Sequence, residues 1–136
     1  MPLDAICLRA VTNELDRALA GCRVEKVYQP DRDELVLQTR GAGGARRLLL
    51  SIAAGAPRVH FIEVARENPA APPMFCLLLR KHLGGGRLTA VTQQGLDRVL
   101  TLHFEASNEL GDRTCFRLVC ELMGRQGNLI LVGENG

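Results

Sequence analysis

The sequence has no tryptophan and only one tyrosine and four phenylalanines, so aromatic side chains contribute little to any core. Its 136 residues are nevertheless 46% hydrophobic, which excludes a largely disordered chain and requires an aliphatic core. No apolar run reaches the roughly 20 residues that a membrane helix needs, and no secretory signal is visible. We therefore expect one domain that resides in the cytoplasm and has no membrane partner.

Metal-binding and redox motifs are also missing. The five cysteines are odd in number and none forms a CxxC pair. Most have apolar neighbours, which favours buried, reduced thiols over a disulfide framework. His60 and His103 stand alone on expected strands, without partners at ligand spacing. The sequence therefore implies no metal and no other cofactor.

The charge balance is nearly even, with 17 basic and 15 acidic residues and a net charge of +2. This excess is too small to identify a nucleic-acid-binding protein by itself. Such a role would require the basic residues to cluster on one surface of the fold.

No catalytic constellation is apparent either. There is no nucleophile–base pair and no Walker loop, and Gly84-Gly85-Gly86 follows an expected helix instead of preceding one, as a phosphate cradle would. Pro2 offers one alternative, because removal of Met1 would expose a secondary amine able to form a Schiff base. We favour reading it as an ordinary second residue, and we expect a protein that is not an enzyme.

The clearest secondary-structure signal in the sequence is a central helix. Pro72-Pro73 can start it, residues 74–79 are apolar or a thiol, and Gly84-Gly85-Gly86 can stop it. A helix over about 73–83 that is apolar on all sides is expected to be buried on more than one side. Its last turn carries Arg80, Lys81 and His82, which are either a solvated helix end or a contact for phosphate.

The remaining chain predicts an α+β fold. An amphipathic helix is expected over about 3–20, and Gln29–Asp33 has the composition of a turn. With the central helix, this gives two main helices and about eight short strands in a mostly antiparallel β-sandwich or open barrel. The strands are expected near 23–28, 34–39, 47–52, 58–62, 87–93, 97–105, 113–122 and 128–132.

Three charges are candidates for a binding site. Arg98 begins an apolar strand face, so its guanidinium must reach solvent or find a carboxylate. It is either a structural strand-end arginine or a planar donor, held by Asp97 or Asp4, that recognises a phosphate or base edge. Asp4 also stands where a helix N-cap belongs, which is typically worth about 1 kcal/mol. Arg125, between two glycines of an expected hairpin tip, is either a surface residue or a contact for a partner.

Several segments together resemble the N-terminal domain of the NFACT family, also called fibronectin-binding protein A-like or RqcH-like proteins. The match runs in order along essentially the whole chain. The segments that carry it are Leu3-Asp4, Gly21 to Pro30, Asn68-Pro69, Pro72 to Leu83, Gly95 to Arg98 and Glu121 to Arg125.

The resemblance implies a role in ribosome-associated quality control. This domain would be the first part of a longer, multidomain protein that binds a large ribosomal subunit blocked by peptidyl-tRNA. That protein would recruit charged tRNA, expected to be alanyl-tRNA, for C-terminal alanine tails on stalled chains. By motif match, Asp4, Asp97 and Arg98 carry over as tRNA-binding residues. Arg80 to His82 and Arg125 carry over as possible RNA-facing positions.

The resemblance also leaves alternatives. The family domain is similar in fold to the N-terminal domain of formamidopyrimidine DNA glycosylases, but here Pro2 is followed by Leu3 and not by glutamate. This similarity leaves a DNA glycosylase or lyase that uses Pro2 as one alternative. One family name implies a second, a fibronectin-binding surface adhesin. A third is a domain that mainly organises its neighbours. The family's usual His-Ser-Asn at the hairpin is replaced by Gln126-Gly127-Asn128.

Overall fold

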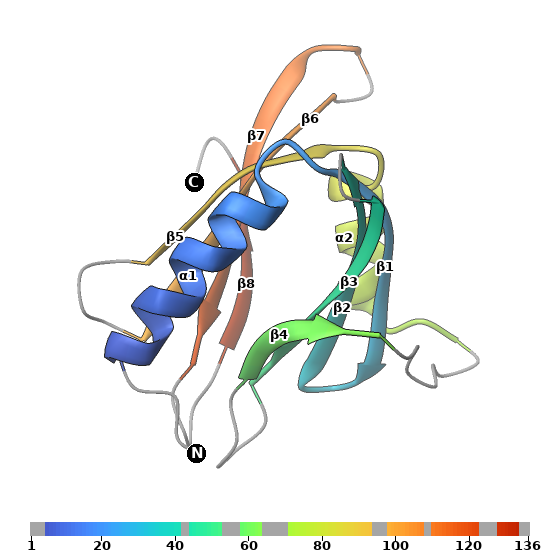
Figure 1. Ribbon diagram of the computed structural model, residues 1–136. Helices are drawn as coiled ribbons and strands as arrows, with labels where there is room; N and C mark the ends of the chain where they lie inside the picture. The colour runs from blue at the N-terminus through green and yellow to red at the C-terminus, as the bar shows by residue number, and fades with distance from the viewer. Residues whose placement is uncertain are drawn as a thin grey trace.

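The computed structural model describes residues 5–41, 44–52, 58–63, 71–93, 98–107, 110–122 and 128–133. Within them two helices accompany eight strands in one antiparallel sheet, ordered β4-β3-β2-β1-β5-β6-β7-β8. This confirms the predicted α+β class (Figure 1). The elements are α1 (Ala5–Leu19), β1 (Arg23–Asp31), β2 (Glu34–Gly41), β3 (Gly44–Ser51), β4 (Arg58–Ile62), α2 (Met74–Leu83), β5 (Arg87–Gln93), β6 (Val99–Ser107), β7 (Arg113–Glu121) and β8 (Asn128–Val132).

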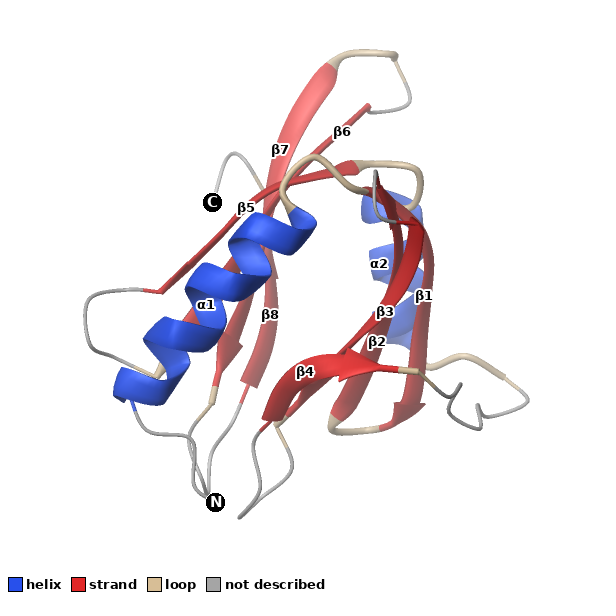
Figure 2. Ribbon diagram, in the orientation of Figure 1, coloured by secondary structure: helices blue, strands red, loops and turns tan. Residues whose placement is uncertain are grey.

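The sheet consists of two four-stranded halves joined at one point. β1 and β5 pair only at their starts, where Arg23 is opposite Arg87. Four backbone hydrogen bonds surround this pair, among them Val24 N–H to the Gly86 carbonyl at 2.8 Å and Gly85 N–H to the Val24 carbonyl at 3.0 Å. Beyond this junction the halves diverge, with β1–β4 on one side and β5–β8 on the other (Figure 2).

Each helix covers a strand edge that the divergence leaves unpaired. α1 lies along β5, and its Asp16 carboxylate accepts a 2.8 Å hydrogen bond from the Val91 N–H. α2 lies beside β1, where the Cys76 thiol and the Arg80 Nε both donate to the Val27 carbonyl, at 3.5 and 2.8 Å. Neither described helix has the length and apolar character that crossing a bilayer would require.

The core is aliphatic, as the scarcity of aromatic residues predicts. Leucine and valine from both helices and both half-sheets form one buried cluster, in which Phe104 is the largest fully buried side chain. Along β6, Leu100, Leu102 and Phe104 are buried while the residues between them are only partly so. This confirms the expected apolar face of that strand.

The turn expected over Gln29–Asp33 is wrong in its bounds. β1 continues through Gln29 and Pro30 to Asp31, which pairs with Glu34 and leaves a two-residue turn at Arg32-Asp33. Proline is tolerated there because this part of β1 has no β5 partner, so the missing N–H breaks no ladder bond on that side.

Candidate nucleic-acid interface

Arg98 lies at the far end of the second half-sheet and is exposed. Gln93, the last residue of β5, pairs with Leu100, so Arg98 lies just beyond the end of β5. Its carbonyl accepts a 2.8 Å hydrogen bond from the Leu122 N–H, which fixes its backbone beside the end of β7. The strand-end position leaves the guanidinium open to solvent, so the apolar face of β6 does not enclose it.

The start of α1 points toward the same end of the sheet. Gly21, just after α1, donates its N–H to the Leu88 carbonyl, and Asp16, earlier in the helix, accepts from the Val91 N–H. Earlier residues of α1 therefore contact later residues of β5. α1 and β5 are therefore antiparallel, and Ala5 lies toward the end of β5. Asp4, Asp97 and Arg125 fall outside the described residues. The described residues that flank them, Ala5, Arg98 and Leu122, lie at or toward this one end, which we call the Arg98 end.

The basic triplet of α2 lies elsewhere. α2 ends at Leu83 and leads directly into the start of β5, so Arg80 to His82 are about 20 Å from the Arg98 end, the length of a seven-residue strand. Arg80 is exposed, but its Nε is bound to the Val27 carbonyl and its guanidinium lies 5.9 Å from the Tyr28 ring centre. His82 is half-buried with its ring 5.1 Å from that of Phe116, and Lys81 is exposed.

The described thiols do not offer reactive groups in the core. Cys22, Cys76 and Cys120 are buried and Cys115 is exposed, and all four are free. Complete burial raises the pKa of Cys120 to about 12, and burial also raises the pKa of Cys76 although Arg80 opposes this. Both thiols therefore stay protonated at neutral pH and pack as small apolar side chains. No group of His, Cys, Asp and Glu within the described ranges could hold a metal ion.

His103 lies on the face of β6 opposite the core. Its Nε2 is 2.9 Å from the Thr92 hydroxyl. Partial burial and the nearby Arg117 lower the pKa of His103 below its ordinary value of 6.5, although Asp16 acts in the opposite sense. The neutral imidazole is therefore the form that the folded chain favours.

A pH-dependent contribution to stability follows from His103. The unfolded chain binds this proton more readily, so the contribution of His103 is full above pH 6.5 and is lost as the pH falls below that value. We expect His103→Gln to remove a slope that cannot exceed about 1.4 kcal/mol per pH unit, the limit for one proton. Urea unfolding of both proteins at several pH values checks this. A difference between the two that is constant below pH 6.5 would contradict it.

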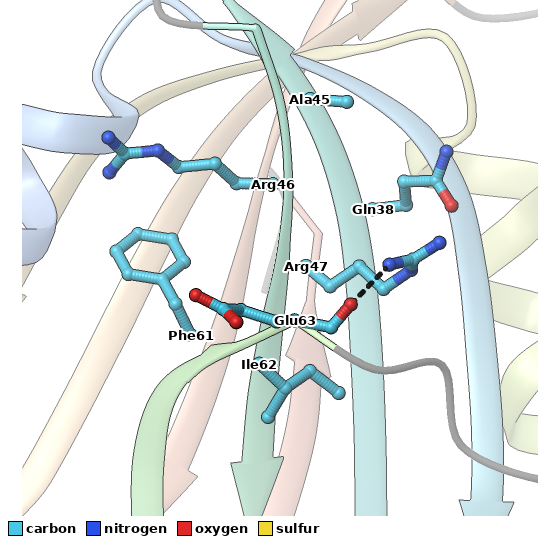
Figure 3. Close-up of a pocket in the computed structure, with 7 residues that line it drawn as sticks. All are labelled: Gln38, Ala45, Arg46, Arg47, Phe61, Ile62 and Glu63. Atoms are coloured by element: carbon cyan, nitrogen blue, oxygen red, sulfur yellow. Dashed lines mark hydrogen bonds between the residues drawn. The ribbon is translucent and has the colours of Figure 1, made fainter.

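Basic residues of β3 border a hollow that the sequence reasoning did not identify. It has a volume of about 500 Å³ and is lined by residues of β2, β3 and β4 together with Glu63. Arg46 and Arg47 extend to opposite sides of β3 (Figure 3). Arg46 lies over the Phe61 ring at 5.1 Å, and Arg47 Nη1 donates to the Glu63 carbonyl at 3.0 Å. The adjacent arginines Arg46 and Arg47 are the only sign of this site in the sequence, and the strand register is needed to show which face of the sheet each one occupies.

The sequence model of a family described as "NFACT N-terminal and middle domains" matches residues 4–136. The chain belongs to the NFACT family. The resemblance inferred from its motifs is thereby confirmed. This NFACT chain is 41% identical over 131 residues to the Rqc2 homolog RqcH of Bacillus subtilis, a match that covers 96% of the chain and 23% of that relative.

Two further comparisons extend the family assignment. The ribosome quality control complex subunit NEMF of Homo sapiens is 32% identical over 128 residues, covering 94% of the NFACT chain and 11% of NEMF. The crystal structure of the N-terminal domain of the fibronectin-binding protein PavA from Streptococcus pneumoniae matches with a TM-score of 0.94 at 35% identity. That match covers 97% of the chain and 50% of the solved one. The chain thus spans less than a quarter of the length of the curated relatives.

Proposed function

We propose that this domain is a non-enzymatic RNA-binding module of a cytoplasmic ribosome quality control factor, and that it holds tRNA at the Arg98 end. The observation that carries the proposal is the position of Arg98. It is exposed at the end of the second half-sheet, where the start of α1 and the end of β7 also lie. A guanidinium is a planar donor suited to phosphates and base edges. By motif, Asp4 and Asp97 are its partners in this role.

The names of the relatives support the quality-control context. The Bacillus subtilis relative is named an Rqc2 homolog and the human relative a subunit of the ribosome quality control complex. By analogy we infer that the protein recruits charged tRNA, in bacteria alanyl-tRNA, to a large ribosomal subunit that carries peptidyl-tRNA. The tRNA would supply residues for C-terminal alanine tailing of the stalled chain. The rest of a longer protein would provide further contacts to the subunit.

The other candidate functions have less support. A lyase that uses Pro2 would leave a covalent adduct with abasic-site DNA after borohydride treatment, and we expect none. The name of the PavA relative refers to fibronectin, but four described cysteines are free thiols, which does not favour a disulfide-stabilised surface module. Surface labelling of intact cells tests the adhesin directly.

Substitution of Arg98 tests the proposed function. In cells, with any further domains of its natural protein attached, we expect Arg98→Ala to reduce co-purifying tRNA about tenfold, because one strong guanidinium contact is worth ~1–3 kcal/mol. We expect Arg98→Lys to give an intermediate loss, since lysine keeps the charge but not the planar fork. Northern blotting of the purified protein measures both effects.

Arg113→Ala is the matched control for this experiment. Arg113 is also an exposed arginine beside the β6–β7 pair, but it pairs with Ser107 at the end opposite Arg98. Its 2.7 Å ion pair with Glu105 is at the surface and is expected to contribute little to stability. Undiminished tRNA on the Arg98→Ala protein, or an equal loss on Arg113→Ala, would count against the Arg98 end as the tRNA site.

A further inference from the structure

Basic side chains gather on one face of the sheet at the junction of its two halves. Arg87 of β5, Arg23 of β1 and Arg40 of β2 are direct register partners and form one row across three strands. Lys26 of β1 and Arg47 of β3 occupy the next row, each opposite the same residue of β2. Opposed residues and residues two apart on a strand share a face of the sheet. We call Arg23, Lys26, Arg40, Arg47 and Arg87 the basic band.

The basic band lies on the face opposite the core. Val24 and Thr39, which follow Arg23 and precede Arg40, are fully buried on the other side of the sheet. Arg23, Arg40 and Arg87 are exposed, so their charged groups reach solvent. The band therefore presents its charge outward, on a surface that the described helices leave open.

Folding alone does not account for this arrangement. Directly opposed residues have Cβ atoms about 5 Å apart, and like charges at such positions destabilise a sheet. Two acidic residues offset part of this charge. Glu25 forms an ion pair with Arg40 at 3.1 Å, and Glu105, the register partner of Arg87, is ion-paired at 2.7 Å with Arg113 outside the band. The band thus keeps an excess of positive charge, and an anionic partner would remove the repulsion within it.

A hollow lies on each side of the band, and each could accommodate part of a bound ligand. On the α2 side, Lys26, Tyr28 and Arg80 contribute to the lining of a hollow of about 440 Å³. On the β4 side, Arg47 borders the hollow shown in Figure 3, and its bond to the Glu63 carbonyl uses one of five guanidinium donors. Arg46 points to the opposite side of β3 and is not part of the band.

We propose that the basic band binds the sugar–phosphate backbone of an RNA strand. Four of its five members are arginines, whose planar donors bind phosphate in two-point contacts. A protein partner would be expected to meet apolar anchors in the centre of its interface, whereas the centre of this band is charged and hydrophilic. The choice of RNA rests on the proposed function, but the band belongs to the junction and not to the Arg98 end, so it constitutes a second contact surface.

The salt dependence of RNA binding tests the band. The probe is a fluorescent oligouridylate without secondary structure, titrated with the 136-residue chain by fluorescence anisotropy at several salt concentrations. We expect the double variant Arg23→Gln/Arg40→Gln to bind more weakly and to show a logarithmic salt slope shallower by about 1.4, the value for two lost contacts to a single strand. We expect the slope to return in Arg23→Lys/Arg40→Lys, which keeps both charges.

A matched control separates local from overall charge. Arg17→Gln/Arg58→Gln removes the same total charge at exposed positions on α1 and β4, outside the band. We expect this control to keep the wild-type slope. We also expect the band variant to melt close to wild type, because the relief of like-charge repulsion offsets the loss of the surface ion pair between Arg40 and Glu25. An unchanged slope in the band variant, equal losses in both double variants, or no binding by the wild-type chain would overturn the proposal.

Two further measurements identify the partner and the site. Oligoglutamate of similar length should compete poorly; equal competition would overturn the assignment to RNA in favour of an acidic protein. Arg98→Ala, assayed for co-purifying tRNA, reports on the proposed tRNA site, whereas the oligouridylate slope of the band variant reports on the band. If Arg98→Ala keeps its tRNA while the band variant loses its slope, the proposed tRNA site fails and the band stands. The reverse result removes the band and leaves the proposed tRNA site intact.

Discussion

Phe104→Ala is expected to destabilise the domain by about 3–5 kcal/mol, the range observed for truncation of a fully buried aromatic residue. Phe104 is 1% exposed and is flanked on β5 and β7 by Leu88 and Phe116. It belongs to the same buried cluster as Leu79 of α2, so the cavity would open between the helix and three strands. Because a domain is typically stable by only about 5–15 kcal/mol, this single change should remove a large part of the total.

Urea unfolding followed by far-UV circular dichroism measures this effect. Leu110→Ala is the control, because it also truncates a large apolar side chain but at a position that is 86% exposed. We expect the control to stay within about 0.5 kcal/mol of wild type. A loss below 1 kcal/mol for Phe104→Ala, or equal losses for the two variants, would mean that Phe104 is not packed in the core as described.

Much of the fold can be predicted from local patterns in the sequence. The alternation of apolar residues along β6 places Leu100, Leu102 and Phe104 on the buried face, and the structure confirms it. The prolines before α2 and the glycines after it bound that helix correctly, at Met74 and Leu83. Patterns of this kind depend on neighbours a few residues apart, which is the scale on which a single sequence is informative.

The candidate sites depend on contacts between distant segments, which local patterns do not contain. Arg23, Arg40 and Arg87 are unremarkable strand residues in the sequence, and only the pairing of β5, β1 and β2 puts them in one row. Pro30 shows the same limit. The composition of Gln29–Asp33 favours a turn, but Pro30 is accommodated within β1 because this part of the strand has no β5 partner.

At the Arg98 end, the candidate residues come from the resemblance to the family and not from periodicity or spacing. The resemblance to the family makes Asp97 and Arg98 candidate tRNA-binding residues, and the structure shows that Arg98 is exposed at a strand end instead of held within the apolar face. The antiparallel run of α1 along β5 brings Ala5, the first described residue of the chain, toward the same end of the sheet as Arg98. The tRNA-binding role of these residues remains a prediction.

Gly84→Ala is expected to cost about 3 kcal/mol, near the upper end of the usual range for overpacking. A Cβ on Gly84 would lie 2.5 Å from the carbonyl oxygen of Arg80. That oxygen already accepts the Gly84 N–H at 3.1 Å in the last turn of α2, so relief of the contact requires this turn to shift. Gly84 leads through Gly85 and Gly86 into β5, and a shift there would disturb the junction of the two half-sheets.

Gly85→Ala is the informative comparison, because it separates steric contact from backbone conformation. Gly85 has a φ of +78°, yet a Cβ there would meet nothing within 4 Å. Its cost is therefore only that of a left-handed alanine, about 1–2 kcal/mol. We expect Gly84→Ala to be the more destabilising in thermal and urea unfolding, although Gly84 has an ordinary negative φ. If Gly85→Ala proves the worse variant, backbone conformation and not the close approach to Arg80 is what requires glycine at this junction.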